Sequence, residues 1–182
     1  MNYLYGIPVY AVSVAVAQGT VGVPGHWSTV AGCVHNPATG ETWTAARGLG
    51  ASVDGEPLPA TGTPPPLDGA LVCTGFGYTS QRRRAQARIV ADLLPRVRDV
   101  RRIGVSSLDL CSVAAGRADA YYERGLHPWD FAAAWLVATE SGVTVRGPRG
   151  GAPSGELLVA ARPPLVDVLG AELDRLGADR DE

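Results

Sequence analysis

The sequence predicts an α+β fold in which an antiparallel block is followed by a layered α/β block. Before residue 59, strand-like segments are separated only by short turn signals, which is typical of an antiparallel sheet. After residue 66, strand-like and helix-like segments alternate, which favours helices packed against a second sheet. A hydrophobic content of 46% with 19% charged residues indicates that the 182 residues bury a substantial core. Together these observations predict a layered α/β sandwich.

The antiparallel block is expected to contain strands over residues 3–17, 27–35 and 41–46. We expect the first strand to be buried, because the run from Ile7 to Ala17 is apolar except for Ser13. Asn36 to Gly40 is a strong turn signal, and Asp54-Gly55 is a hairpin dipeptide. The segment 59–66, rich in proline, glycine and threonine, indicates a linker. We therefore predict two subdomains, the remaining part of an antiparallel sheet in residues 1–66 and an α/β unit in residues 67–182.

The α/β unit is expected to begin with a short strand and to end with an amphipathic helix. The predicted strands cover residues 70–74, 100–103, 120–123, 143–146 and 157–161, and the predicted helices cover 80–97, 105–115, 128–142 and 164–176. The run Arg82-Arg83-Arg84 is interpreted as a solvated helix face. Ser106 or Ser107 can cap the second helix, with Asp109 completing a weak capping box, so we predict a structural role for Asp109.

Composition excludes several classes of partner and gives no sign of a membrane protein. A net charge of −2 provides no bulk attraction to nucleic acid or to an anionic membrane. No apolar segment approaches the ~20 residues that a membrane-spanning helix needs. The run 7–17 could also form a signal-peptide core, but no arginine or lysine precedes it, and we prefer a strand. The three separated cysteines are interpreted as buried hydrophobes of a reducing compartment, which favours a cytoplasmic location.

The stretch from Gly116 to Gly142 carries the main candidate site. A strand ends at Glu123, and His127-Pro128 then begins a helix whose first turn contains Asp130. The free N–H groups and the dipole of that turn favour an ionised carboxylate, which suits a hard cation. Because no sulfur or imidazole cluster accompanies these acids, the residues point to Mg²⁺ if any metal binds. The alternative is an ordinary first-turn acid at Asp130 and a solvated strand-end charge at Glu123.

A second candidate element is the turn Gly104-Val105-Ser106, which joins a strand to a helix. The free N–H groups at a helix N-terminus can bind phosphate or hydroxyl oxygens. A plain tight turn is the alternative. The sequence contains no Gly-x-Ser-x-Gly motif, P-loop or zinc-type spacing, and His127 is interpreted as a turn residue rather than a base.

Two strings in this region resemble the inositol monophosphatase family. Asp119-Ala-Tyr-Tyr-Glu123 and Gly125-Leu-His-Pro-Trp-Asp130-Phe-Ala-Ala are similar to its C-terminal signature, and Asn2 to Ser13 is similar to the segment after its central metal-binding motif. The resemblance implies an α-β-α-β-α sandwich and a magnesium-dependent phosphomonoesterase that hydrolyses inositol monophosphate, is often dimeric and is inhibited by lithium. It also implies that Asp130 binds metal, that Glu123 contacts the hydroxyls of a small phosphorylated polyol, and that Gly104 and Ser106 line the substrate pocket.

The resemblance covers the C-terminal two-thirds of the family pattern. The family motif Asp-Pro-Ile-Asp-Gly-Thr-Thr-Asn would end at Asn2, so its two metal-ligating aspartates lie outside this sequence, as do an earlier glutamate ligand and the N-terminal helices. We therefore expect an N-terminally truncated enzyme that is weakly active or inactive alone, and that self-associates through an exposed apolar face. The alternatives are a non-catalytic binding or dimerisation module, or a related sugar, histidinol or nucleotide phosphatase.

Overall fold

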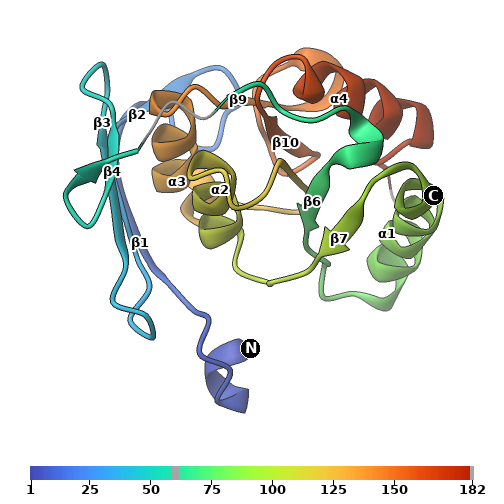
Figure 1. Cartoon of the computed structure of the whole chain (residues 1–182), viewed down its shortest axis with the longest axis horizontal. Helices are drawn as coiled ribbons and strands as arrows, with labels where there is room; N and C mark the ends of the chain where they lie inside the picture. Colours follow the sequence, from blue (N-terminus) through green and yellow to red (C-terminus); the bar gives the residue numbers. More distant parts are fainter. Residues whose placement is uncertain (59–61, 181–182) are drawn as a thin grey trace.

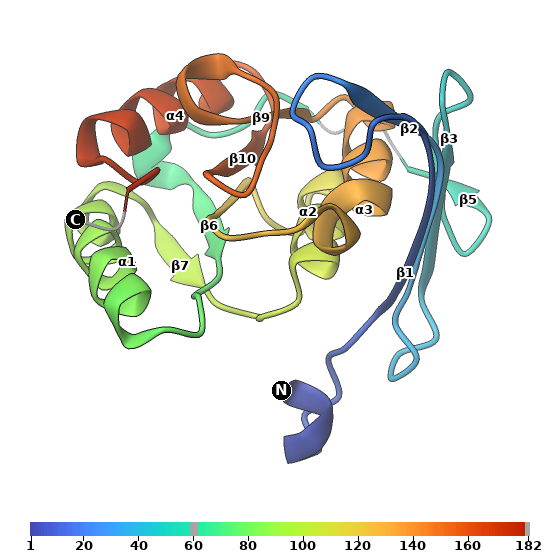
Figure 2. The same cartoon turned by 180° about the vertical axis from the view of Figure 1, so that it is seen from behind.

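The computed structural model describes residues 1–58 and 62–180, and it confirms the predicted layered α/β fold (Figure 1). Two five-stranded sheets enclose one pair of helices, and a second pair of helices covers the far face of the second sheet (Figures 1 and 2). The layers therefore follow the order sheet, helices, sheet, helices. The division into subdomains at residue 66 stays a prediction, and residues 59–61 of the predicted linker lie outside the described residues.

The first sheet is wholly antiparallel. Its strands, β1 (Val12–Gly19), β2 (Trp27–His35), β3 (Thr42–Ala46), β4 (Ala51–Val53) and β5 (Glu56–Pro57), pair in chain order. The strands predicted over residues 27–35 and 41–46 are confirmed. Asp54 and Gly55 both have positive φ, 51° and 86°, and they connect β4 to β5 as the predicted hairpin turn.

The predicted first strand is wrong in its first half and in its burial. Residues Asn2–Tyr5 form a 3₁₀ helix, η1, and the strand begins only at Val12. Val12, Val14 and Val16 are 56%, 59% and 58% exposed. The helices cover only one face of the first sheet (Figure 1), and alternate residues of a strand share a face. Because Ser13, Ala15 and Ala17 lie beside residues of α3, the three valines lie on the uncovered face. The apolar run therefore marks a sheet covered on one side rather than a buried strand.

The second sheet is mixed and lies deeper in the molecule. Its strands are β6 (Leu71–Thr74), β7 (Asp99–Arg101), β8 (Ala120–Glu123), β9 (Thr144–Arg146) and β10 (Leu158–Ala161), in the order β7-β6-β8-β10-β9. β6 is parallel to β7 and β8, whereas β10 is antiparallel to β8 and β9. All four residues of β10 are buried. The carboxyl ends of β6, β7 and β8 therefore meet at one edge of this sheet.

Four α-helices lie close to their predicted ranges. They are α1 (Ser80–Leu93), α2 (Ser106–Ala114), α3 (Pro128–Glu140) and α4 (Leu165–Leu176), and short 3₁₀ helices follow at η2 (Leu67–Gly69), η3 (Leu94–Arg96) and η4 (Pro148–Gly150). α2 and α3 lie between the sheets, and α1 and α4 cover the outer face of the second sheet. No helix of the described part of the chain is long and apolar enough to cross a membrane.

The central helices α2 and α3 lie side by side and point the same way. At their N-terminal ends, the Ser106 hydroxyl donates to the backbone oxygen of Asp130 at 2.9 Å. At their C-terminal ends, the Arg162 guanidinium donates to the carbonyls of Val113, Ala114 and Ser141 at 3.0–3.2 Å. The pair is thus held at both ends. The positive charge of Arg162 also interacts favourably with the C-terminal ends of the two helix dipoles, which stabilises the pair further.

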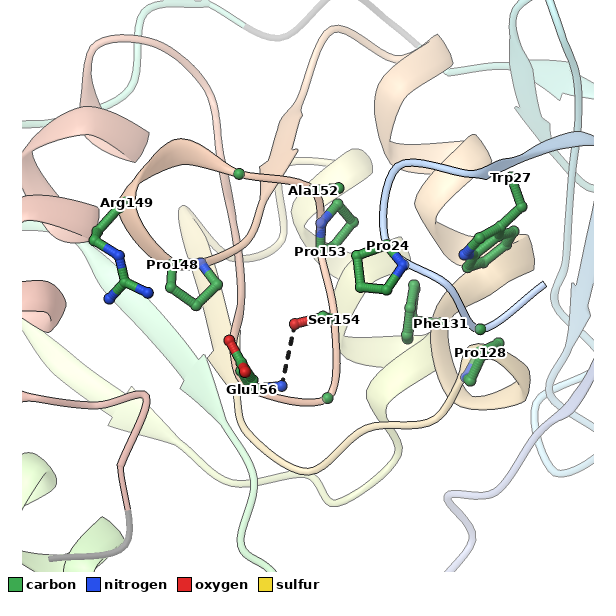
Figure 3. Close-up of a pocket in the computed structure, with 13 residues that line it drawn as sticks. Pro24, Trp27, Pro128, Phe131, Pro148, Arg149, Ala152, Pro153, Ser154 and Glu156 are labelled. Carbon is green, nitrogen blue, oxygen red and sulfur yellow. Dashed lines mark hydrogen bonds between the residues drawn. The ribbon is translucent and has the colours of Figure 1, made fainter. Parts of the chain in front are cut away.

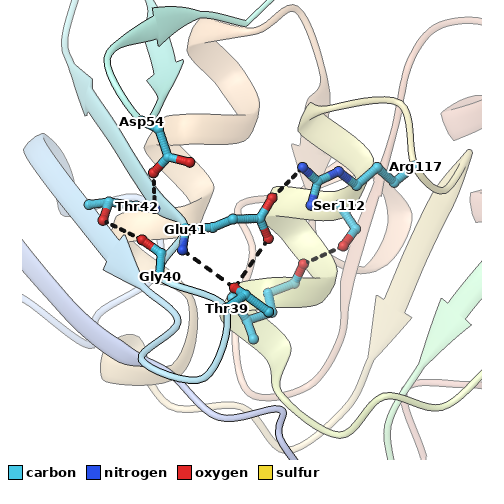
Figure 4. Close-up of polar contacts among 8 residues, drawn as sticks. Thr39, Gly40, Glu41, Thr42, Asp54, Ser112 and Arg117 are labelled. Atoms are coloured by element: carbon cyan, nitrogen blue, oxygen red, sulfur yellow. Dashed lines mark hydrogen bonds and ion pairs between the residues drawn. The ribbon is translucent and has the colours of Figure 1, made fainter.

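The first sheet reaches the central helices through close packing and one polar contact. A Cβ at Gly32 of β2 would lie 2.8 Å from the carbonyl oxygen of Ala133, so only glycine allows α3 to approach this closely. Arg117, after α2, forms an ion pair with Glu41 (Figure 4). Its guanidinium also lies 5.6 Å from the ring centroid of Trp43. These contacts attach the covered face of the first sheet to the centre of the molecule.

The cysteines agree with the absence of a disulfide framework predicted from their spacing. Cys73 and Cys111 are buried, Cys33 is half-buried, and all three are free. Burial raises the pKa of the Cys73 thiol to about 12, so this sulfur behaves as a neutral, buried group at neutral pH.

Candidate functional site

A cavity of about 820 Å³ opens where β6, β7 and β8 end and where α2 and α3 begin. Ligands of open α/β sheets commonly bind outside the carboxyl ends of the strands, which is where this cavity lies. All four residues singled out in the sequence line it, namely Gly104, Ser106, Glu123 and Asp130. Segments separated by 26 residues of sequence are therefore brought to one cavity, which we take as the candidate site.

Asp130 occupies the third position of α3, and its carboxylate is fixed in place. The backbone N–H of His127 donates to Asp130 Oδ2 at 2.8 Å, so the acid closes the helix N-terminus as the sequence predicts. Asp130 Oδ1 has no hydrogen bond among the described residues. One carboxylate oxygen is therefore used by the helix, while the other is available to the cavity.

Glu123 ends β8 and is held between a tyrosine and a glycine. The hydroxyl of Tyr121 donates to Glu123 Oε2 at 2.7 Å, and a Cβ at Gly75 would overlap the Glu123 carboxylate. Burial raises the pKa of Glu123, and the nearby charge of Asp130 adds to that rise, whereas the Tyr121 hydrogen bond and the charge of Arg102 oppose it. Glu123 is thus a preorganised acceptor close to both Asp130 and Arg102.

The loop Gly104–Ser106 differs from the capping box predicted for α2. Its N-cap is Val105, without a side-chain cap, and the Ser106 hydroxyl is instead used to contact Asp130. Gly104 has φ of 84°, and the Arg102 guanidinium occupies the space that a Cβ at this position would need. The predicted capping box is therefore wrong, because a contact between helices takes the hydroxyl that local sequence assigns to the cap.

Asp109 lies behind this loop and has no capping role. Its side chain is fully buried, and its carboxylate oxygens have no hydrogen bond of normal geometry among the described residues. Burial raises the pKa of Asp109 to about 7, and the charge of Glu123 adds to the rise. The burial of Asp109 could have been predicted from the sequence, since Asp109 is flanked by the apolar residues Leu108 and Leu110 on a helix that is buried on almost all sides.

Three arginines of the cavity wall were not assigned to the site from the sequence. Arg82 of α1, Arg102 after β7 and Arg124 after β8 all line the cavity. Only part of the run 82–84 is a solvated face, because Arg83 and Arg84 are exposed whereas Arg82 is half-buried and lines the cavity. The periodicity of α1 places Arg82 on a helix surface, but only the tertiary fold shows that this surface faces Glu123 and Gly125.

Trp129 lies in the first turn of α3, next to Asp130. It is 71% exposed and stacks on His127 with ring centroids 4.6 Å apart. It lines the mouth of the cavity rather than the core.

The donors in the described residues do not complete a magnesium site. No group of three or more His, Cys, Asp or Glu side chains within residues 1–58 and 62–180 is arranged to hold a metal ion. Asp130 offers one oxygen, and the Glu123 carboxylate is already engaged by Tyr121. Magnesium needs near-octahedral oxygen coordination, with one or two carboxylates plus water and phosphate. These residues can therefore supply one metal ligand, and no reaction step through a metal follows from them alone.

A second cavity, of about 520 Å³, has a different character (Figure 3). It lies between the β1–β2 connection, the start of α3 and the loop after η4, and its walls are mainly proline and aromatic side chains, including Pro24, Trp27 and Phe131. Arg149 and Glu156 are its charged residues. None of the predicted site residues lines it, and it contains no pair of acids, so the larger cavity remains the candidate site.

Sequence comparison places the chain among known proteins. The profile described as the inositol monophosphatase family matches residues 1–180. Inositol-1-monophosphatase SuhB of Mycobacterium tuberculosis (strain ATCC 25618 / H37Rv) is 46% identical over 181 residues, covering 96% of this chain and 59% of that protein. Nus factor SuhB of Escherichia coli (strain K12) is 39% identical over 151 residues, covering 82% of this chain and 54% of that protein. The chain thus spans a little over half the length of these relatives.

Solved structures of similar proteins agree with the sequence comparison. Mycobacterium tuberculosis SuhB superposes with a TM-score of 0.83 at 45% identity, covering 98% of this chain and 69% of that structure. An inositol monophosphatase from Anabaena superposes with a TM-score of 0.82 at 28% identity, covering 96% and 67%.

Proposed function

The chain belongs to the inositol monophosphatase family, and on this premise we propose that it forms the substrate-binding part of a magnesium-dependent phosphomonoesterase that converts myo-inositol monophosphate to inositol and phosphate. The observation that carries the proposal is the convergence of Gly104, Ser106, Glu123 and Asp130 on one cavity. We further propose that the active protein is a homodimer inhibited by lithium. The cytoplasmic location and the lack of nucleic-acid binding expected from the sequence stay predictions.

In this proposal each residue of the cavity has a distinct task. Asp130 supplies one metal ligand through the oxygen that the His127 N–H leaves unused. Glu123, oriented by Tyr121, accepts hydrogen bonds from substrate hydroxyls. The loop Gly104–Ser106 and the N-terminal ends of α2 and α3 favour an anionic ester, because free N–H groups and the helix dipoles point toward it. Magnesium, when bound, would activate a water and stabilise the leaving oxygen.

Because the described residues supply only one metal ligand, we propose that residues 1–182 alone turn over substrate at background level. The test is a fusion in which the N-terminal part of the Mycobacterium tuberculosis relative, up to the segment that the family resemblance aligns with Asn2, precedes residue 1. Magnesium-dependent release of phosphate from inositol monophosphate is expected for the fusion, with loss of at least ~100-fold for Asp130→Asn.

Asp92→Asn, on the exposed surface of α1, is the matched control and should keep full activity. Turnover by residues 1–182 alone that Asp130→Asn abolishes would contradict the proposed division of ligands. A folded fusion with no turnover would contradict the phosphatase proposal itself.

A second candidate is a non-catalytic binding module. It is favoured by the 39% identity to a relative named Nus factor SuhB and by the incomplete metal site of the described residues. It would be supported if the fusion bound magnesium and inositol monophosphate but released no phosphate. Related sugar, histidinol and nucleotide phosphatases would instead be identified by turnover of their own esters in a substrate panel.

A further inference from the structure

Two neighbouring strands of the second sheet build the surroundings of Glu123. β6 and β8 are parallel, and Cys73 pairs with Tyr121 across them. Gly75 follows β6 directly, and Glu123 is the last residue of β8. The strands therefore bring Gly75 and Glu123 side by side at the cavity. Because alternate residues of a strand share a face, Tyr121 lies beneath Glu123 on the side of the central helices.

Tyr121 holds one oxygen of the Glu123 carboxylate from below. Its side chain is fully buried, and its hydroxyl donates to Glu123 Oε2 at 2.7 Å. Burial raises the pKa of Tyr121 well above its ordinary value, so the hydroxyl keeps its proton and remains a donor. A buried hydroxyl that lost this acceptor would have no water to replace it, so the contact is costly to break.

Gly75 fixes the plane of the same carboxylate. A Cβ at Gly75 would overlap Cδ, Oε1 and Oε2 of Glu123, so the flat side of the carboxylate lies against the glycine backbone. The φ of Gly75 is not positive, so it is the space and not the backbone conformation that requires glycine here. The terminal torsion of a glutamate is ordinarily broad, and this contact together with the Tyr121 hydrogen bond restricts it.

The oxygen that remains faces the cavity. Glu123 lines the cavity, and its Oε1 accepts no hydrogen bond from any residue that the structure describes. We propose that Tyr121 and Gly75 are positioning residues that leave Glu123 a single accepting oxygen in a single direction, so that the site recognises one hydroxyl position of a polyol monophosphate. This inference rests on the proposed function and deepens it. A site built to bind a hydroxyl discriminates against an analogue that lacks it.

The test compares ligands that differ by one hydroxyl, and it uses the 182-residue chain in metal-free buffer so that no turnover is needed. Inositol monophosphate and a series of deoxyinositol monophosphates, each lacking one hydroxyl, are titrated into the isotope-labelled chain, and their Kd values are measured by NMR. One analogue is expected to bind about 10-fold more weakly than the parent, which corresponds to one lost hydrogen bond to a charged acceptor. The others should differ from the parent by less than about 3-fold.

Tyr121→Phe keeps the ring and removes only the donor. It should weaken binding of the parent and leave the one discriminated analogue unchanged, so that the ratio of their Kd values falls from about 10 to about 2. Gly75→Ala should lower the ratio as well, because the added methyl displaces the carboxylate. In a Glu123→Ala chain, Tyr121→Phe should have no further effect on the ratio, because a positioning residue acts only through Glu123.

Tyr122→Phe is the matched control. Tyr122 is buried at the next position of β8 but packs in the core cluster on the other face of the sheet, so the ratio should stay unchanged. Equal affinity for all the ligands, no measurable binding, or equal weakening of parent and analogue by Tyr121→Phe would overturn the proposal. Gly75→Ala gives an independent reading if Tyr121→Phe does not fold. Because no phosphate is released in this experiment, failure of the phosphatase proposal in the fusion assay remains separately visible.

Discussion

The two sheets differ in how many of their faces are covered by helices, and this difference determines how much their apolar side chains contribute to stability. The second sheet has helices on both faces, and every residue of β10 is buried. The first sheet is covered by α2 and α3 on one face only, and its other face presents Val12, Val14 and Val16. Apolar side chains of the same type therefore contribute strongly in one sheet and little in the other, because only burial converts apolar area into stability.

The largest effect is expected from Leu158→Ala in β10. Leu158 is fully buried, so its truncation leaves a cavity that should lower the free energy of unfolding by about 2–5 kcal/mol. Val14→Ala on the open face of β1 should change it by less than about 0.5 kcal/mol. Urea denaturation followed by circular dichroism measures both. Equal losses would mean that the open face is covered in solution, as it would be in the self-association expected from the sequence.

Asp109→Asn tests whether the well-covered side of the molecule also contains an unfavourable charge. The pKa of Asp109 is raised from 3.8 to about 7 in the folded protein. As the pH rises from about 4 to about 7, the unfolded chain ionises this group first, so the folded state loses stability across this window. Asp109→Asn should remove this loss and raise the free energy of unfolding at neutral pH by about 2–4 kcal/mol.

Urea titrations of both proteins across this pH range give the measurement. The two curves should converge at the acid end, where Asp109 is protonated in both states. A parallel shift at every pH would show instead that asparagine merely packs differently.

On the covered face of the first sheet, Gly32→Ala should be destabilising by about 1–3 kcal/mol. The new methyl would meet the backbone of Ala133, and neither β2 nor α3 can move without disturbing the layer between the sheets. Gly62→Ala is the control, because an added Cβ meets nothing there and φ is not positive. Thermal unfolding compares the two. A neutral Gly32→Ala would show that the first sheet is attached more loosely than its packing indicates.

The smallest effect is expected for Glu41→Gln, at the polar contact between the first sheet and the loop after α2. Arg117 lowers the pKa of Glu41, so the pair stabilises the fold above the ordinary pKa of the acid and is lost as the pH falls through the lowered value. Because both side chains are partly exposed, the loss should be about 0.2–1 kcal/mol and should shrink in high salt. Chemical denaturation at low and high ionic strength measures this loss. A loss that did not change with salt would show that it does not come from the ion pair with Arg117.

The fold was largely predictable from the sequence where the hydrophobic pattern of a segment matches the side chains that the structure buries. The strand over residues 27–35 and the helix predicted over 164–176 appear nearly as expected, because β2 buries Trp27 and Val34 and α4 buries one apolar face. The segment before Val12 was not predictable in the same way. Its apolar residues satisfy a strand pattern, but Gly6 adopts φ of 68° and ends a 3₁₀ turn, which leaves Tyr3 and Leu4 exposed.

The candidate site was predictable from the motif strings but not from local rules. Asp130 closes α3 as the helix signals require, and Glu123 ends β8 as expected. By contrast, the use of Ser106 to contact Asp130 depends on a neighbour 24 residues away. The arrival of Arg82 at the cavity depends on glycines at positions 77 and 125, which no helical periodicity encodes.

The contacts of Arg162 at the C-terminal ends of α2 and α3 also fix how the N-terminal ends of these helices are arranged. One guanidinium holds the last carbonyls of two helices whose first residues meet at Ser106 and Asp130. Neither helix can slide or rotate against the other without breaking a contact at each end, so the pair has a single register. The spacing between Asp130, the proposed metal ligand, and the loop Gly104–Ser106 therefore depends on a residue outside the cavity. Replacing it would alter substrate affinity while leaving every group that touches the substrate chemically intact.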